Sequence, residues 1–142
     1  MRIDETDIQK AVVKRLKENG FNVVADDVKE GFSRPAIFVG TYPSEITRLC
    51  GGMERVTDVV SMFYYPKAET RVQCMFGANR IRNLFMYRTL DVQNRKFTIE
   101  ELTNEIDENN VLSTEFELTY EQPIPDDEDY EDAEILYIGG ID

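Results

Sequence analysis

The chain lacks the residue pair on which most nucleophilic enzymes depend. Its 142 residues include two cysteines but no histidine, so a Ser–His or Cys–His nucleophile pair is excluded. Gly51-Gly52 precedes an expected strand, which indicates a hinge and not a glycine-rich phosphate loop opening a helix. We predict a protein that is not an enzyme and needs no cofactor. The alternative, a small carboxylate-based enzyme, would need two acids converging in a concave apolar site.

Two groups of residues contain possible metal ligands, and neither predicts a metal site. Cys50 and Cys74 have no Cys or His neighbour at ligand spacing, so we expect free thiols, with Cys74 as a small core residue on a helix. An acidic run follows residue 125, and its members are Asp126, Asp127, Glu128, Asp129, Glu131, Asp132 and Glu134. An EF-hand loop needs a glycine at its mid-loop turn, which this run lacks. We therefore expect a solvated linker.

Charge divides the chain into two parts. The net charge is −12, and all 16 Lys and Arg lie within residues 1–96, beside 12 acids. Residues 97–142 hold 16 acids and no Lys or Arg, a formal charge of −16. Phosphate contacts require basic side chains, so specific DNA binding by this half is excluded. The acidic half is either a solvated tail or a surface that repels DNA or meets a basic partner.

Neither a membrane span nor a secretory signal is expected. No apolar run approaches the ~20 residues that a bilayer requires. The acidic residues Asp4 and Glu5 follow directly after the first three residues, which leaves no apolar signal-peptide region. These features predict a soluble protein made in the cytoplasm.

Two helices are expected. The first begins at Asp4 or Thr6 and ends at Asn19-Gly20, with one apolar stripe at Ile8, Ala11, Val12 and Leu16. The second covers about residues 69–90, and its apolar pattern includes Val72, Met75, Phe76, Leu84 and Phe85. Its polar face carries Arg80, Arg82 and Arg88. These arginines are either an ordinary solvated face or partners for the acidic surface of a neighbouring subunit.

The strands are expected at residues 22–28, 36–42, 53–65 and 111–120, with a further strand and a turn of helix within 97–106. Pro43 should end the second strand, which leaves residues 44–52 as a loop. Residues 91–96 are expected to form a polar turn. Phe63, Tyr64 and Tyr65 alternate along the long third strand, so they cannot all face one side. They are either core or a subunit interface.

The chain beyond residue 122 is expected to be an extension. Pro123 and Pro125 end the last long strand, and an acidic linker follows. Its final apolar residues are Ile135, Leu136, Tyr137 and Ile138. They are too apolar to stay solvated, so they either add a strand to the sheet or dock on a partner. The whole pattern predicts an α+β domain over residues 1–122, with an antiparallel, or mixed, sheet of four to five strands and two main helices, followed by the acidic extension 123–142.

Several segments resemble a known family, and the first is the helix opening at residues 8–12 (IQKAV) with Leu16. Residues 28–39 (VKEGFSRPAIFV) resemble a V-x-x-G-F-x-x-P-x-F-F-I stretch, and residues 62–66 (MFYYP) resemble an F-x-I-x-Y-F-P strand end. Residues 109–116 (NNVLSTEF) are similar to a D-G-V-L-H-F strand start, with Ser113 where the family pattern has His. In this order, over about residues 8–120, the segments resemble the tail terminators of phages and prophages of Gram-positive bacteria.

The resemblance implies a structural virion protein. Such proteins form a hexameric ring on the last ring of the tail tube, end tail polymerisation and offer a surface to the neck or head. The implied partners are further copies of the chain, the tail tube protein, the neck or head-completion protein and, in a contractile tail, the sheath. The implied location is the virion tail, with assembly in the host cytoplasm. An acidic lumen formed by residues 126–132 would let DNA pass. The alternative function is an acidic adaptor or inhibitor that occupies a basic groove.

Overall fold

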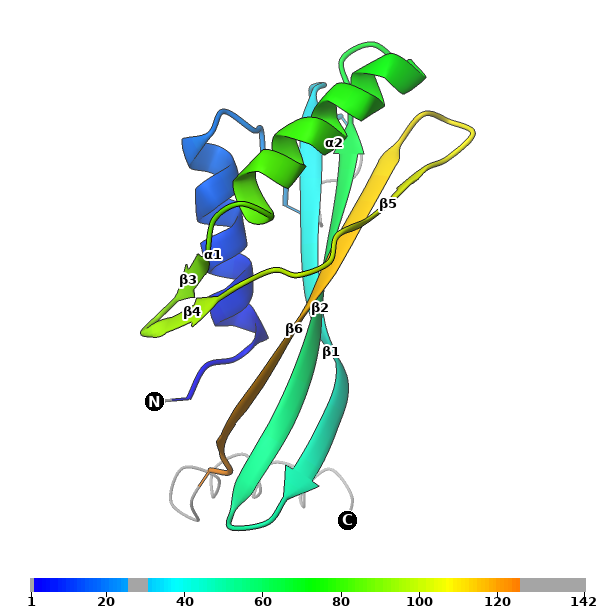
Figure 1. Cartoon of the computed structure of the whole chain (residues 1–142). Coiled ribbons are helices and arrows are strands. Elements are labelled where there is room, and N and C mark those ends of the chain that lie inside the picture. The colour runs from blue at the N-terminus through cyan, green and yellow to red at the C-terminus, as the bar shows by residue number, and fades with distance from the viewer. Residues whose placement is uncertain (1, 26–30, 126–142) are drawn as a thin grey trace, which may run out of the picture.

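The computed structural model describes residues 2–25 and 31–125. The chain forms an α+β fold in which two helices and a small hairpin cover one face of a long antiparallel sheet (Figure 1). In chain order the elements are α1 (Glu5–Glu18), β1 (Ala36–Leu49), β2 (Met53–Tyr65), α2 (Arg71–Phe85), β3 (Leu90–Val92), β4 (Arg95–Phe97), β5 (Thr103–Ile106) and β6 (Leu112–Pro123). The expected fold class is confirmed.

Helix α1 begins where the sequence places an acidic cap. Asp4 accepts a hydrogen bond from the Asp7 backbone N–H, and the Asp7 carboxylate accepts one from the Asp4 N–H, both at 3.0 Å. This reciprocal pair satisfies two donors that a helix N-terminus leaves free. Ile8, Val12 and Leu16 are fully buried, so the predicted apolar stripe is the face that packs on the sheet.

The main sheet has the strand order β1-β2-β6-β5, and every pairing in it is antiparallel. Strands β1 and β2 form a long hairpin, and β6 pairs with β2 along nearly its whole length, from Met53↔Pro123 to Tyr64↔Leu112. Side chains along β2 and β6 alternate between the two faces of the sheet, as predicted. One face of β6 is buried and mostly apolar, with Thr114 and Gln122 as its polar members, whereas the other carries Ser113, Glu115, Glu117 and Thr119.

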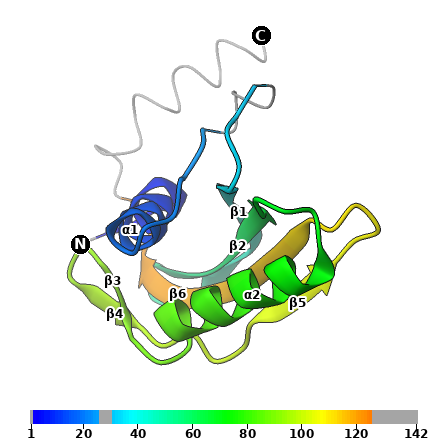
Figure 2. The same ribbon diagram turned by 90° about the horizontal axis from the view of Figure 1, so that it is seen from above.

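Both helices and the β3–β4 hairpin lie on the same side of the sheet, as the view along it shows (Figure 2). The core is therefore the single layer between them. Val60 and Met62 of β2 and Phe116 of β6 meet Val12 of α1 and Phe85 of α2 in one buried cluster. The opposite face of the sheet has no helix among the described residues, and it remains an outer surface.

The expected loop at residues 44–52 is wrong over most of its length. Strand β1 continues through Pro43 to Leu49, with a bulge between Pro43 and Glu45. Proline is tolerated on an edge strand where its missing N–H would have pointed away from the sheet. A β-bulge then absorbs one extra residue and lets pairing resume. The expected strand at 22–28 is also not formed as such: Val23 makes one parallel bridge to Ile37, and residues 26–28 lie outside the described part.

Residues 91–106 also differ from expectation. The polar segment expected as a simple turn joins two short strands, β3 and β4. The turn of helix expected within 97–106 is absent there, because Ile99 and Leu102 fall in an irregular segment and Thr103–Ile106 form β5. The second helix is shorter than expected, Arg71–Phe85. Within the described ranges, no helix is long and apolar enough to span a membrane.

Candidate functional site: assembly surfaces and a buried carboxyl cluster

Helix α2 carries two apolar stripes, and only one of them is in the core. Thr70 caps the helix by accepting a hydrogen bond from the Gln73 N–H at 3.3 Å. The core stripe consists of Cys74, Gly77, Ile81, Leu84 and Phe85. The second stripe, called here the α2 stripe, consists of Val72, Met75 and Phe76, whose exposed fractions are 55%, 52% and 59%.

The α2 stripe is a surface that the sequence analysis missed. All apolar residues of this helix were assigned to one pattern, although Val72, Met75 and Phe76 are offset from Cys74, Gly77 and Ile81 around the helix. Spacing of i, i+3 and i+4 places the three exposed side chains on a single face. The sequence signal that could have revealed this surface is that the helix is apolar on two faces, because a helix packed on one sheet buries only one stripe.

Gly77 lets α2 approach β2 closely. A Cβ at this position would lie 2.6 Å from two ring carbons of Tyr64. No side chain larger than a hydrogen atom fits there without moving the ring. The helix therefore keeps a residue of low helix propensity because the tyrosine ring of β2 fills the space.

The three aromatic residues near the end of β2 are divided between the two faces of the sheet. Tyr64 lies in the core beneath α2, whereas Phe63 is 44% exposed on the outer face. Tyr65, also on the outer face, makes edge contacts with Phe32 and Phe38, with ring centroids 5.1 and 5.5 Å apart. The outer face therefore carries an aromatic cluster at the end of the sheet where β1 begins and β2 ends. Phe63 is the most exposed residue of this cluster.

The arginines singled out on the second helix have different surroundings. The Arg80 guanidinium lies over the Phe21 ring, 4.0 Å from its centroid, and donates a hydrogen bond to the Asn19 carbonyl at 3.0 Å. Arg80 therefore ties α2 to the end of α1. Arg82 donates to Asn79 Oδ1 at 2.6 Å, and Arg88 is exposed just after the helix. Their proposed role at a subunit interface stays a prediction.

A third surface is acidic. Glu100 and Glu101 from the segment before β5, and Glu115 and Glu117 from the outer face of β6, line a cavity of about 490 Å³. Nearby, Arg55 of β2 holds Glu121 through a paired contact of 3.0 and 2.7 Å. Some of the acidic residues of the C-terminal half therefore gather on the surface of the described part of the chain.

A carboxyl group is buried at the centre of the fold. Asp58 of β2 has no exposed surface, and its Oδ2 accepts a hydrogen bond from the Tyr120 hydroxyl at 2.7 Å. Glu5, in the first turn of α1, places Oε2 at 3.4 Å from the same hydroxyl. Asp58 Oδ1 has no hydrogen-bond partner among the described residues.

Burial perturbs the titration of this cluster. Loss of solvation raises the pKa of Asp58 to about 7, and the neighbouring Glu5 carboxylate adds to the rise, whereas the Tyr120 hydroxyl opposes it. Burial also raises the pKa of the Tyr120 phenol. The sequence analysis did not single out Asp58. Its signal was an acid between Val56 and Val60 on the otherwise apolar face of a strand.

Several predicted features concern thiols, metals and the extension. Cys74 is buried on α2 and Cys50 is exposed, and both are free thiols, as expected. Over residues 2–25 and 31–125, no group of three or more acidic, Cys or His side chains is arranged to hold a metal ion. The candidate linker residues 126–132 and the candidate docking residues 135–138 lie outside the described residues.

No curated protein matches this chain. A family model described as phage tail terminator protein matches residues 7–130, a range that covers α2, all the strands and α1 except its first two residues. The match agrees with the resemblance carried by residues 28–39, 62–66 and 109–116, and it indicates a structural role in a phage tail. The chain therefore belongs to the phage tail terminator protein family.

Proposed function

We propose that the protein caps the tail tube as a ring, ends tail polymerisation and forms the joint to the neck or head. The observation that carries this proposal is the α2 stripe on a chain of the tail terminator family. Its partners would be further copies of the chain, in a hexamer, together with the tail tube protein and the neck or head-completion protein. In a contractile tail the sheath would be a further partner. The role is structural, and we propose no catalysis.

The α2 stripe supports self-association because exposure of its apolar side chains to water is unfavourable. Burying the exposed parts of Val72, Met75 and Phe76 would contribute roughly 1 kcal/mol for each side chain. Three such side chains on one helical face resemble the apolar centre of a protein interface more than a solvated surface.

A closed ring also requires a second, different surface. Head-to-tail contacts join two unlike patches of the same subunit, and the rotation between subunits closes the ring. Phe63 lies on the outer face of the sheet, whereas the α2 stripe lies beyond the opposite face. The two patches thus belong to opposite sides of the sheet, so they could serve as the two unlike contacts of a ring subunit.

The test is native mass by light scattering, first alone and then with the cognate tail tube protein. We expect either a hexamer in solution or a monomer that adds one ring to tube ends and halts their growth. Tube length, measured by electron microscopy, provides the second readout. A monomer that leaves tube length unchanged at every ratio would overturn the proposal.

The acidic cavity favours a second candidate function, that of an adaptor binding a basic partner. Glu100, Glu101, Glu115 and Glu117 gather on one surface, and complementary charge steers and orients protein partners. In that case, replacing Glu115 and Glu117 with glutamine would abolish partner binding, whereas changing the α2 stripe would not. The opposite result favours the ring.

A further inference from the structure

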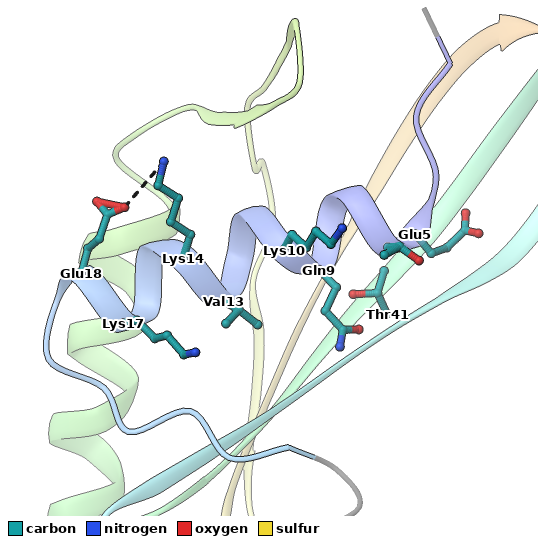
Figure 3. Close-up of a pocket in the computed structure, with 9 residues that line it drawn as sticks. Glu5, Gln9, Lys10, Val13, Lys14, Lys17, Glu18 and Thr41 are labelled. Atoms are coloured by element: carbon teal, nitrogen blue, oxygen red, sulfur yellow. Dashed lines mark ion pairs between the residues drawn. The ribbon is translucent and has the colours of Figure 1, made fainter.

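A groove runs between α1 and the outer edge of β1. Its volume is about 650 Å³, and its lining is formed by one side of α1 together with Thr41 of β1. Gln9, Val13 and Lys17 extend from the helix toward the strand in Figure 3, whereas Lys14 points away from the strand, toward Glu18. Lys10 is a further lining residue. Val13 is partly buried and supplies the apolar side chain of this lining. Three lysines and two glutamates, Glu5 and Glu18, also border the groove, so its rim is basic by one charge.

The strand that borders the groove has an unpaired edge. The Ile37 N–H donates to the Asn22 carbonyl, and the Ile37 carbonyl accepts from the Val24 N–H, both at 2.9 Å. The Ile37 backbone therefore points away from β2. Hydrogen-bonding groups alternate along an antiparallel strand, so those of Val39 and Thr41 point the same way. Among the described residues, neither has a backbone partner on that side.

We propose that residues 135–138 of the same chain bind in this groove as an additional strand, antiparallel to β1. This inference goes beyond the proposed function and does not depend on it. Edge addition would supply main-chain hydrogen bonds for the outward groups of Val39 and Thr41. It would also remove an exposed sheet edge, which otherwise favours aggregation.

The length of the remaining chain fits this site. The Ile124 N–H donates to the Gly52 carbonyl at 2.8 Å, so the chain leaves the described fold at the same end as the β1–β2 turn. From Leu49, near this turn, to Thr41 is a distance of about 26 Å along the strand. Residues 126–134 can span about 30 Å when extended. Residues 135–138 therefore reach the groove, running opposite to β1.

The chemistry of the segment matches the groove. Ile, Leu, Tyr and Ile at positions 135–138 favour a strand. In a strand, alternate side chains would face Val13. The linker before them carries seven acids, and Lys10 and Lys17 make no ion pair within the described residues. Lys14 has only a 4.0 Å contact with Glu18. The basic rim is thus available to the acidic linker.

Disulfide trapping in the full chain tests the proposal. The exposed thiol is first removed by Cys50→Ser, and Val13→Cys is then combined with Leu136→Cys. We expect rapid formation of an intramolecular disulfide under mild oxidation, seen as a fast-migrating monomer on a non-reducing gel. The matched control combines Val13→Cys with Ile141→Cys, which lies beyond Gly139-Gly140 and should form the bond at least about tenfold more slowly. Equal rates in the two variants, or mainly disulfide-linked dimers, would overturn the proposal.

Amide hydrogen exchange gives an independent readout without any new thiol. Protection of the Val39 and Thr41 amides should fall at least about tenfold in the double variant Ile135→Asp/Leu136→Asp. It should be unchanged in Ile141→Asp, which adds one acid to the same tail. Neither variant alters the domain core, so loss of folding does not confuse the result. Unprotected Val39 and Thr41 amides in the wild-type chain would contradict the proposed strand addition.

Discussion

The Tyr120 hydroxyl donates a 2.7 Å hydrogen bond to Asp58 Oδ2 in the buried layer between the sheet and the first turn of α1. The two residues come from adjacent strands, β2 and β6. Their pair places an ionisable group in the core of the domain. Because burial raises its pKa to about 7, this group should make stability depend on pH near neutrality.

The first prediction concerns Asp58→Asn. The folded-state pKa is above the ordinary value of 3.8, so the folded protein binds this proton more tightly than the unfolded chain does. The stability contributed by Asp58 is therefore fully present below about pH 4 and is lost as pH rises through about 7. The asparagine variant should lack this loss. Urea denaturation measures the unfolding free energy of both proteins at pH 5 and pH 8. The difference, variant minus wild type, should be more positive at pH 8 than at pH 5.

The control for this measurement is Glu117→Gln, which removes an exposed acid from the outer face of β6. Its difference from the wild type should be nearly the same at both pH values. A constant difference for Asp58→Asn as well would show that Asp58 does not titrate in this range.

The second prediction concerns Tyr120→Phe. This change removes the hydroxyl that donates to the buried carboxyl, and a buried acceptor without its partner costs about 1–3 kcal/mol of unfolding free energy. It also removes the interaction that lowers the pKa of Asp58, so the pH at which stability falls should move upward. Denaturation curves between pH 5 and pH 9 measure both effects. An unchanged midpoint pH would contradict the assigned hydrogen bond.

The third prediction concerns Gly77→Ala. Helix propensity alone would stabilise α2 by about 1 kcal/mol. The new Cβ, however, would meet the Tyr64 ring at 2.6 Å, and overpacking a core costs about 1–3 kcal/mol. We expect net destabilisation, measured by thermal or urea unfolding. In a Tyr64→Leu background the same change should become neutral or stabilising, and failure of this rescue would remove the steric explanation.

The fourth prediction concerns the α2 stripe. Met75→Asp/Phe76→Asp should leave the fold intact, because both side chains are about half exposed, but it should abolish ring formation and tube capping. Circular dichroism checks the fold, and light scattering with tube-length measurement checks assembly. The matched control is Asn83→Asp, which adds a negative charge at another exposed position of the same helix. Normal capping by the double variant would exclude this stripe from the interface.

Local patterns predicted much of the fold. The Asp4 cap and the stripe at Ile8, Val12 and Leu16 predicted α1, since capping and 3.6-residue periodicity are properties of a single segment. Alternation along residues 53–65 correctly separated Phe63 and Tyr65 from Tyr64. The same local character explains why these elements were found with nearly correct bounds.

The sequence by itself determined the fold class, the two main helices, the long alternating strands and the resemblance to the tail terminators, because these depend on neighbouring residues. Only the tertiary structure decided the rest. Pro43 continues a strand because β1 lies at the sheet edge, and Phe76 is exposed because Gly77, on another side of α2, faces Tyr64. Asp58 has a raised pKa because α1 and β6 enclose it. Each outcome depends on which distant segment covers a residue, and that information is absent from any local pattern.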